Sequence, residues 1–326
     1  MKFFNRFAVS LLASVLCAST LFAMPVDAKK TTKRRQPTQA ELAAAAALQA
    51  AIDERYNKEI ESNSWENWPA GPQVYAESAI VMEASTGTIL YSKAIDEQHY
   101  PASITKIMTA LLVFTNGNMD DVVTISEENV TLEEGSQRVG FQVGDQVTMD
   151  ELVHCLLVYS GNDAASAIAT HVGGSTENFV SMMNAYAAQL GCTGTHFTNP
   201  HGLQDENHYT TPYDIYLMLK EALKYPEFTE ITQMGSYTAN YKYSDGSDAS
   251  VVLTATDHYL TGEATAPKGV TILGGKTGTT SSAGNCLALL CQNEYGNPFI
   301  SIVMGASSKE LLYQEMSSLL ENINTV

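Results

Sequence analysis

The order of extended and helical segments constrains the fold of this chain more than any other feature. Apolar runs at residues 79–82 and 89–91 flank a Ser85-Thr86-Gly87 turn, and this pattern predicts a hairpin. Because strands are expected near both ends of residues 75–326, one economical arrangement brings them into a single antiparallel sheet. The later strands are expected at residues 235–243, 251–254, 270–273, 287–290 and 299–304.

Helical spacing of apolar residues dominates the region between these two groups of strands. Helices are expected at residues 149–159, 163–172, 176–190 and 212–223, and a closing amphipathic helix at residues 308–323. The predicted fold class is α+β: an antiparallel sheet flanked by helices, with an inserted, mainly helical lobe. Active sites commonly lie at such a junction.

The first 28 residues have the pattern of an export signal. Lys2 and Arg6 precede a mostly apolar stretch at residues 7–22, and Val26-Asp27-Ala28 offers the small residues that a signal peptidase accepts. The apolar stretch is shorter than the roughly 20 residues of a comfortable membrane span. Cleavage after Ala28 is therefore favoured, although an uncleaved N-terminal anchor stays open.

Two parts are expected after the signal. Residues 29–73 combine a basic start with an Ala-rich run and are expected to form a tether, since they have little to bury. Residues 74–326 are expected to form the folded domain. Neither a C-terminal β-rich domain nor a C-terminal membrane-binding helix is expected after residues 308–323.

The chain is strongly acidic, with a formal charge of −18, so simple electrostatics argue against nucleic acid as a partner. Export permits disulfides, and four cysteines outside the signal allow three pairings. Three of the four lie in apolar runs, where a free buried thiol is the commoner outcome. The four are Cys155, Cys192, Cys286 and Cys291. No cluster with metal-ligand spacing occurs, so neither a metal nor a cofactor is expected.

The first candidate motif is Ser103-Ile104-Thr105-Lys106, at the predicted start of a helix. Residues three apart share a helix face, so the Lys106 amine can reach the Ser103 hydroxyl. A serine hydroxyl needs a base to become a nucleophile, and a lysine can be that base only when neutral. Burial and a second nearby cation would both lower its pKa.

The second motif, Ser160-Gly161-Asn162, lies in a loop between two predicted helices. A loop held by two helices is a rigid mount for a hydroxyl and an amide, although these three residue types are also those of a plain turn. Taken alone, this motif and the first are each explained by ordinary local structure.

The third motif, Lys276-Thr277-Gly278-Thr279, follows the apolar residues 270–273 and is expected at the end of an edge strand. Gly278 would let a substrate backbone approach closely. Lys276 would supply positive potential, and the hydroxyl groups of Thr277 and Thr279 would bind an anionic group.

The three motifs together are a strong indication of function, because they occur in a characteristic order: S-x-x-K, then a Ser-containing triplet, then K-T-G. Class A β-lactamases and penicillin-binding proteins share this order. The chain resembles the low-molecular-mass penicillin-binding proteins, and more narrowly the serine-type D-alanyl-D-alanine carboxypeptidases. The stretches that carry the resemblance are residues 101–106 (PASITK), 160–165 (SGNDAA), 199–203 (NPHGL) and 275–284 (GKTGTTSSAG).

The resemblance implies a β-lactamase/transpeptidase-like fold and a peptidoglycan stem peptide ending in D-Ala-D-Ala as substrate. Ser103 would attack the carbonyl between the two D-alanines, Lys106 would accept its proton, and Ser160 would relay a proton to the departing D-Ala. β-Lactams would acylate Ser103 as covalent inhibitors. The enzyme would act outside the cytoplasmic membrane, in the cell-wall space.

The resemblance also implies binding roles. Asn162 would hold Lys106 and the substrate amide, and Lys276 would sustain the electrostatics of the site. Thr277 and Thr279 would orient the terminal carboxylate, and the backbone N–H groups of Ser103 and Thr279 would form the oxyanion hole.

One departure concerns the substrate carboxylate. Many relatives place an arginine near residues 305–310 to receive it, but no arginine follows Arg138 in this chain. Lys309 or Thr279 would then take that role. His201 is expected to be structural and hydrogen-bonded, because a Ser–Lys site needs no imidazole.

Three alternatives stay open. A class A β-lactamase is disfavoured, because the second motif is S-G-N and no E-x-x-L-N stretch separates Ser160 from Lys276. A D,D-endopeptidase of the same family would carry the same three motifs. A non-catalytic sensor of β-lactams or wall fragments would keep the motifs without turnover.

Overall fold

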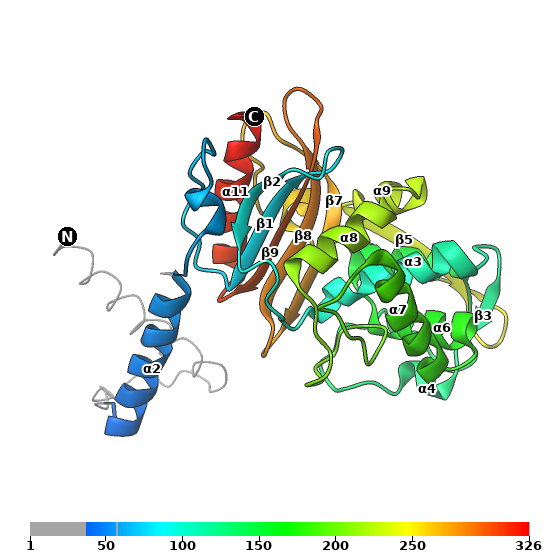
Figure 1. Ribbon diagram of the computed structural model, residues 1–326. Coiled ribbons are helices and arrows are strands. Elements are labelled where there is room, and N and C mark those ends of the chain that lie inside the picture. The colour runs from blue at the N-terminus through cyan, green and yellow to red at the C-terminus, as the bar shows by residue number, and fades with distance from the viewer. Residues whose placement is uncertain (1–36, 57, 326) are drawn as a thin grey trace, which may run out of the picture. The chain divides into compact units, whose positions relative to one another are not determined.

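The computed structural model describes residues 37–56 and 58–325 (Figure 1). The predicted signal at residues 1–28 and the start of the predicted tether lie outside the described residues. Helix α2 (Gln39–Tyr56) begins after Thr38, which exchanges hydrogen bonds with Glu41 in a capping arrangement. The chain divides into two units between Leu48 and Gln49, and the folded domain belongs to the second unit.

A five-stranded antiparallel sheet joins the beginning and the end of the domain, and it confirms the prediction that both ends share one sheet (Figure 1). The strand predicted at residues 270–273 continues to Thr280 and therefore carries the Lys276 motif. The strand order is β2 (Ile89–Lys93), β1 (Ser78–Glu83), β9 (Pro298–Ala306), β8 (Gly284–Gln292) and β7 (Thr271–Thr280).

Both faces of this sheet are covered by helices, which explains why β8 and β9 are apolar almost throughout. Ile80 and Met82 of β1 belong to the core on the side of α8 (Pro212–Ala222). Their neighbours in the strand, Ala79 and Val81, face the opposite core beneath α11 (Lys309–Glu321), because side chains alternate along a strand.

The inserted lobe is mainly helical, as predicted, and Figure 1 shows α3, α4, α6 and α7 gathered beside the sheet. Side-chain caps define several helix starts: Ser175 accepts from the Asn178 amide, and Thr211 accepts from the Asp214 amide. The lobe helices are α3 (Lys106–Asn116), α4 (Glu127–Val130), α5 (Met149–His154), α6 (Asn162–Gly173), α7 (Thr176–Leu190) and α9 (Pro226–Thr232).

A second sheet corrects one expectation. The strands predicted at residues 235–243 and 251–254 do not join the large sheet but form a hairpin on the lobe, where Ala239 and Leu253 face the core. Two short strands complete this sheet, and their three-residue runs were too brief to predict from periodicity. The order is β3 (Val122–Thr124), β4 (Gln146–Thr148), β5 (Ser236–Lys242) and β6 (Asp248–Thr254).

The packed domain begins before the predicted boundary at residue 74. The 3₁₀ turn η1 (Glu61–Ser64) lies against β2, and the Glu61 carboxylate accepts hydrogen bonds from the Ser92 hydroxyl and the Ala94 amide. Ile60 is buried in the core beneath α11. A buried turn needs no apolar periodicity, which is why this segment resembles a tether in the sequence.

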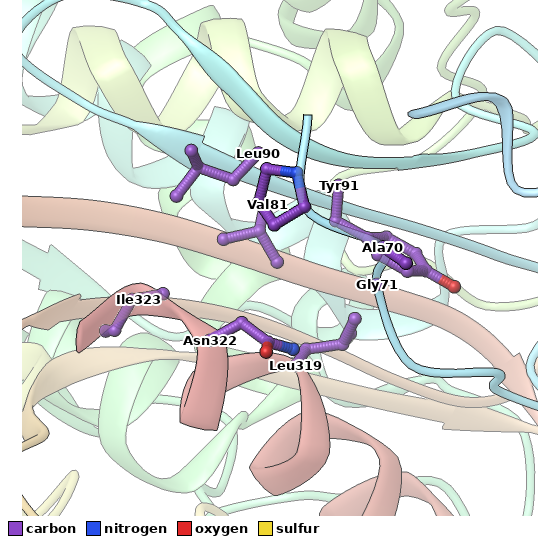
Figure 2. Close-up of a pocket in the computed structure, with 9 residues that line it drawn as sticks. Ala70, Gly71, Val81, Leu90, Tyr91, Leu319, Asn322 and Ile323 are labelled. Atoms are coloured by element: carbon purple, nitrogen blue, oxygen red, sulfur yellow. The ribbon is translucent and has the colours of Figure 1, made fainter. Parts of the chain in front are cut away.

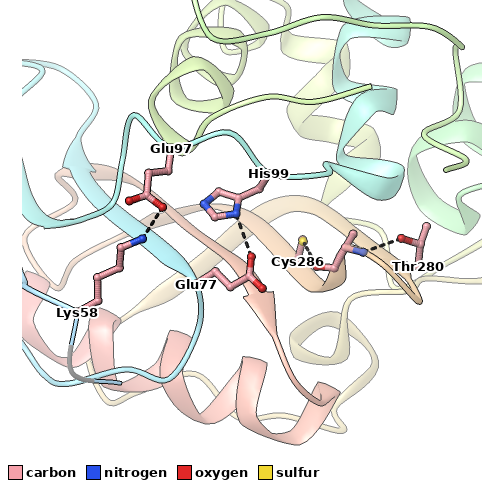
Figure 3. Close-up of polar contacts among 7 residues, drawn as sticks. Lys58, Glu77, Glu97, His99, Thr280 and Cys286 are labelled. Atoms are coloured by element: carbon pink, nitrogen blue, oxygen red, sulfur yellow. Dashed lines mark hydrogen bonds and ion pairs between the residues drawn. The ribbon is translucent and has the colours of Figure 1, made fainter. Parts of the chain in front are cut away.

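The rest of the segment before β1 is also anchored. The indole N–H of Trp68 donates to the Leu90 carbonyl at 3.1 Å, and Lys58 pairs with Glu97 (Figure 3). Residues 69–71 reach across β1 and β2 to the end of α11 and enclose a small, mostly apolar pocket (Figure 2). Its lining residues are Pro69, Ala70, Gly71, Val81, Leu90, Tyr91, Leu319, Asn322 and Ile323.

The four cysteines within the described residues are free and buried, as the apolar runs favour. Burial raises the pKa of Cys286 to about 12 and that of Cys291 to about 12, so both thiols stay protonated at neutral pH. Across residues 37–56 and 58–325, no helix has the length and apolar character needed to cross a membrane.

Candidate active site

Ser103 lies in the 3₁₀ turn η2 (Ala102–Thr105), directly before α3. The turn is tighter than the α-helical start predicted from the sequence. Ala102 has a φ of 46°, an unusual left-handed conformation for a residue with a side chain. The approach to the turn is fixed by His99, whose Nδ1 lies 3.0 Å from Glu77 Oε2 (Figure 3).

Lys106 is fully buried, and three oxygen atoms surround its side-chain nitrogen. Lys106 Nζ lies 2.8 Å from Ser103 Oγ, 2.7 Å from Asn162 Oδ1 and 2.8 Å from the His201 carbonyl oxygen. A neutral amine has two N–H donors and one lone pair. Two donors suit the amide and carbonyl oxygens, and the lone pair is then left for the proton of the Ser103 hydroxyl.

The surroundings of Lys106 favour its neutral form. Burial holds the pKa of Lys106 well below its usual range, and the positive charge of Lys276 lowers it further. Asp163 has the smallest of the three effects and opposes the other two. Its carboxylate accepts hydrogen bonds from four backbone amides: those of Val139, Gly140, Phe141 and Ala164. The arrangement therefore supplies a base at hydrogen-bonding distance from a serine hydroxyl.

Ser160 lies where α5 ends in a π-helical turn, η3 (Cys155–Tyr159), a rare element that often marks functional sites. Its φ of 68° reverses the chain, and the Gly161 amide closes the turn by donating to the Cys155 carbonyl at 3.1 Å. Helix α6 begins at Asn162, so its amide side chain points back to Lys106. The loop therefore provides the rigid mount that the sequence predicts.

A neighbouring loop completes this wall. The Asn162 amide donates to the Gln137 carbonyl at 2.8 Å, and the Gln137 side chain donates to the Tyr159 carbonyl at 3.3 Å. The Asp163 carboxylate holds residues 139–141 through their backbone amides. The loop is thus fastened to the Ser160 turn at several points, and Gln137 faces the cleft beside Ser160.

The third motif lies on the edge strand β7, next to the Ser103 turn. A Cβ atom added to Gly278 would lie 2.9 Å from the Ser103 nitrogen, so a side chain there would crowd the turn. Thr277 Oγ1 lies 2.5 Å from Thr256 Oγ1, and Thr279 Oγ1 donates to Asn285 Oδ1 at 3.2 Å. Lys276 is buried, and its Nζ donates to the Thr277 carbonyl at 2.9 Å.

The predicted site residues form two tiers around one cleft. Lys106, Asn162 and Lys276 lie buried behind its wall. The predicted residues that line the cleft itself are Ser103, Ser160, Thr277, Gly278 and Thr279. Further lining residues were not predicted from motifs: Gln137, Thr256, Cys286, Leu312 and Tyr313. Lys309, suggested as a carboxylate ligand, also lines the cleft.

Two histidines support the site without entering it. The Leu203 amide donates to His201 Nδ1 at 3.2 Å, and burial lowers the pKa of His201 to about 3, so its ring is neutral. The ring of His208 accepts the Thr198 amide at Nδ1, which leaves Nε2 to donate to Thr105 at 2.7 Å. These contacts support the structural role expected for His201.

Comparison with known proteins identifies the family of the chain. Residues 66–308 match the Peptidase_S11 family, described as D-alanyl-D-alanine carboxypeptidase. The chain belongs to this family. The Peptidase_S11 chain is 35% identical over 252 residues to D-alanyl-D-alanine carboxypeptidase DacF of Bacillus subtilis. It is 32% identical over 261 residues to D-alanyl-D-alanine carboxypeptidase DacC of Escherichia coli.

Each of these matches covers 76% of this Peptidase_S11 chain but only 61% of the relative, so the chain spans about three fifths of their length. A solved structure of the Streptomyces K15 DD-transpeptidase matches the fold with a TM-score of 0.73 and 28% identity. That match covers 79% of this chain and the whole of the K15 chain. The predicted β-lactamase/transpeptidase-like α+β fold is confirmed.

Proposed function

We propose that the chain is a serine-type D-Ala-D-Ala carboxypeptidase that works through an acyl-enzyme on Ser103. The observation that carries the proposal is the 2.8 Å contact between Lys106 Nζ and Ser103 Oγ, made by a lysine whose pKa burial holds well below its usual range. Family membership supports the choice of D-Ala-D-Ala as substrate.

In the acylation step, Ser103 Oγ bonds to the carbonyl carbon between the two D-alanines while its proton moves to Lys106 Nζ. The backbone N–H groups of Ser103 and Thr279 stabilise the oxyanion. The C–N bond then breaks, and the departing D-Ala amine takes a proton through the Ser160 hydroxyl. Water attacks the ester in the second step, with Lys106 again accepting a proton, and regenerates Ser103.

Substrate binding uses the β7 side of the cleft. The hydroxyl groups of Thr277 and Thr279 receive the terminal carboxylate, and Lys276 provides positive potential from behind them. Lys309 begins α11 at the cleft, exposed to solvent, and supplies the cation that relatives take from arginine. Asn162 holds Lys106 and the substrate amide.

The site of action follows from the same substrate. Stem peptides of peptidoglycan lie outside the cytoplasmic membrane, and the export pattern at residues 1–28 would deliver the chain there. β-Lactams would enter as mimics of D-Ala-D-Ala and form a stable ester with Ser103.

Mass spectrometry of a D-Ala-D-Ala stem peptide incubated with the purified protein tests this proposal. Loss of one D-Ala is expected with the native chain and with Ser85→Ala, a matched change at an exposed hairpin turn. Ser103→Ala should release none. A Ser103→Ala protein that still releases D-Ala would exclude Ser103 as the nucleophile.

A second candidate function is transpeptidation, favoured by the match to the whole K15 DD-transpeptidase. An amine would then replace water in the second step. Adding a D-amino acid or glycine acceptor to the same incubation separates the two outcomes: an exchanged peptide marks transfer, and a shortened peptide marks hydrolysis.

A further inference from the structure

A short segment after β6 connects three walls of the active site. The Thr256 amide donates to the carbonyl of Val158 in the π-helical turn at 3.3 Å, and Thr256 Oγ1 lies 2.5 Å from Thr277 Oγ1 on β7. The next residue, Asp257, accepts the Tyr313 hydroxyl of α11 at 3.3 Å. The carboxylate of Asp257 is therefore held at the meeting point of the lobe, the edge strand and the closing helix.

The two oxygens of Asp257 have different surroundings. Oδ1 accepts the Tyr259 amide at 2.9 Å and the Tyr313 hydroxyl. Oδ2 is buried and has no hydrogen-bond partner among the described residues. A buried carboxylate oxygen without a partner is costly unless a charge compensates it. Burial raises the pKa of Asp257, whereas the two donors to Oδ1 and the positive charge of Lys276 lower it, so a nearby cation is the expected compensation for the ionised form.

The charged and titratable groups that act on Asp257 come from three elements. Lys276 faces it from β7, and Tyr313 faces it from α11. His258 and Tyr259 belong to its own short helix, α10 (His258–Thr261). His258 pairs with Glu263 at 2.9 Å, which leaves Lys276 as the fully buried cation of this group.

A different carboxylate therefore raises the pKa of each of the two buried lysines of the site. Burial lowers the pKa of Lys276 to about 7, and Asp257 raises it. Asp163 is the carboxylate that acts on Lys106, and the charge of Lys276 opposes it. A charge on Asp257 thus favours protonated Lys276, and protonated Lys276 in turn favours neutral Lys106. Two coupled groups pushed toward opposite protonation states are typical of acid–base sites.

We propose that Asp257 is a positioning residue that holds Lys276 in its charged form and thereby leaves Lys106 free to act as the base. The inference rests on the proposed function, because it assumes acylation of Ser103. It adds a residue outside the three motifs, fixed by the segment that joins β6 to β7.

Asp257→Asn tests the inference in the full chain, since asparagine keeps the acceptor for Tyr259 and Tyr313 and removes the charge. The second-order rate of acylation by a fluorescent penicillin is measured from pH 5 to pH 9.5. Loss of the Asp257 charge should move the alkaline limb of this profile about one pH unit lower, because Lys276 then loses its proton earlier. Asp257→Glu should restore the native limb.

Asp214→Asn is the matched control. Asp214 is equally buried and also accepts a backbone amide, that of Gly194 at 2.8 Å, but its partners Gly194 and Thr195 lie outside the cleft lining. The alkaline limb of the pH profile of Asp214→Asn should therefore match that of the native chain. Asp257→Ser keeps a hydroxyl cap for α10 and replaces Asp257→Asn if the latter does not fold.

The outcomes separate the two proposals. A native chain that no penicillin acylates would overturn the proposed function and this inference with it. This inference alone would be overturned if penicillin acylates the native chain and the neutral Asp257 variants lower the rate by the same factor at every pH. Asp257 would then have a structural role.

Discussion

Gly202 lies directly against Ala102, so that a Cβ atom on Gly202 would be 1.8 Å from the Ala102 carbonyl oxygen. Gly202 has a φ of +89°, and Ala102 itself is in the left-handed region. Gly278 approaches the same turn from β7. Ser103, the proposed nucleophile, is therefore held in a turn that two glycines from different parts of the chain approach closely.

Gly202→Ala should unfold more easily and should also slow acylation of Ser103, because the methyl group meets backbone that cannot move aside. We expect a loss of at least about 3 kcal/mol in the free energy of unfolding. Gly246→Ala is the matched control: its φ is +85°, but no atom lies within 4 Å of the added Cβ. It should lose about 1 kcal/mol. Equal losses in urea titrations would show that the contact with Ala102 is unimportant.

Lys106→Arg should abolish acylation by penicillin at every pH, because a guanidinium stays charged and cannot accept the Ser103 proton. In the native chain, acylation should fall as the pH falls through the depressed pKa of Lys106. Lys220→Arg, a change at an exposed lysine of α8 that does not line the cleft, serves as the control. Measurable acylation by a folded Lys106→Arg protein would rule out Lys106 as the base.

Lys309→Ala should lower kcat/KM for D-Ala release about tenfold, mainly through KM, because it removes an exposed cation that lines the cleft. Lys309→Arg should keep most of the activity. Lys268→Ala removes an exposed cation that does not line the cleft and should have no effect. If Lys309→Ala and Lys268→Ala behave alike, Thr277 and Thr279 bind the carboxylate without help from Lys309.

The folded chain should lose stability as the pH falls from 6.5 to 4. Burial lowers the pKa of His208 from 6.5 to about 4, so the unfolded chain binds this proton more tightly than the folded chain. The stability is fully present above pH 6.5, and roughly 3 kcal/mol from His208 is lost toward pH 4.

His208→Asn should remove roughly half of this slope, because His201, whose pKa burial lowers to about 3, gives a similar share. A change at His171, which pairs with Asp121 near the surface, should not alter the slope. Urea titrations at several pH values measure both effects. An unchanged slope in His208→Asn would mean that this ring does not remain neutral in the folded chain.

Removal of residues 1–73 should destabilise the domain by about 3–5 kcal/mol, whereas removal of residues 1–57 should leave its stability largely unchanged. The longer deletion removes the buried Ile60, the contacts of Glu61 with β2 and the Trp68 hydrogen bond. Thermal unfolding of the two shortened chains compares them directly. Equal melting temperatures of the two shortened chains would show that the folded domain begins at residue 74.

The sequence by itself determined the local elements and the order of the motifs. Helices such as α7 begin at a capping serine, Ser175, and end at Gly191, whose φ is +85°, so their limits depend on neighbouring residues. The apolar runs of β1 and β9 likewise depend on nearby residues alone. The three motifs could therefore be placed on a helix start, a loop and a strand before any fold was known.

Only the tertiary structure decided how these elements act together. Lys106 contacts Asn162 and the His201 carbonyl across 56 and 95 residues, and its neutral form depends on burial by segments that no local pattern identifies. The surroundings of Asp257 likewise depend on segments that are distant in the sequence. The same dependence explains why the hairpin β5–β6 lies on the lobe and not in the large sheet. Burial and charge interactions depend on distances in space, whereas motif spacing records only distances along the chain.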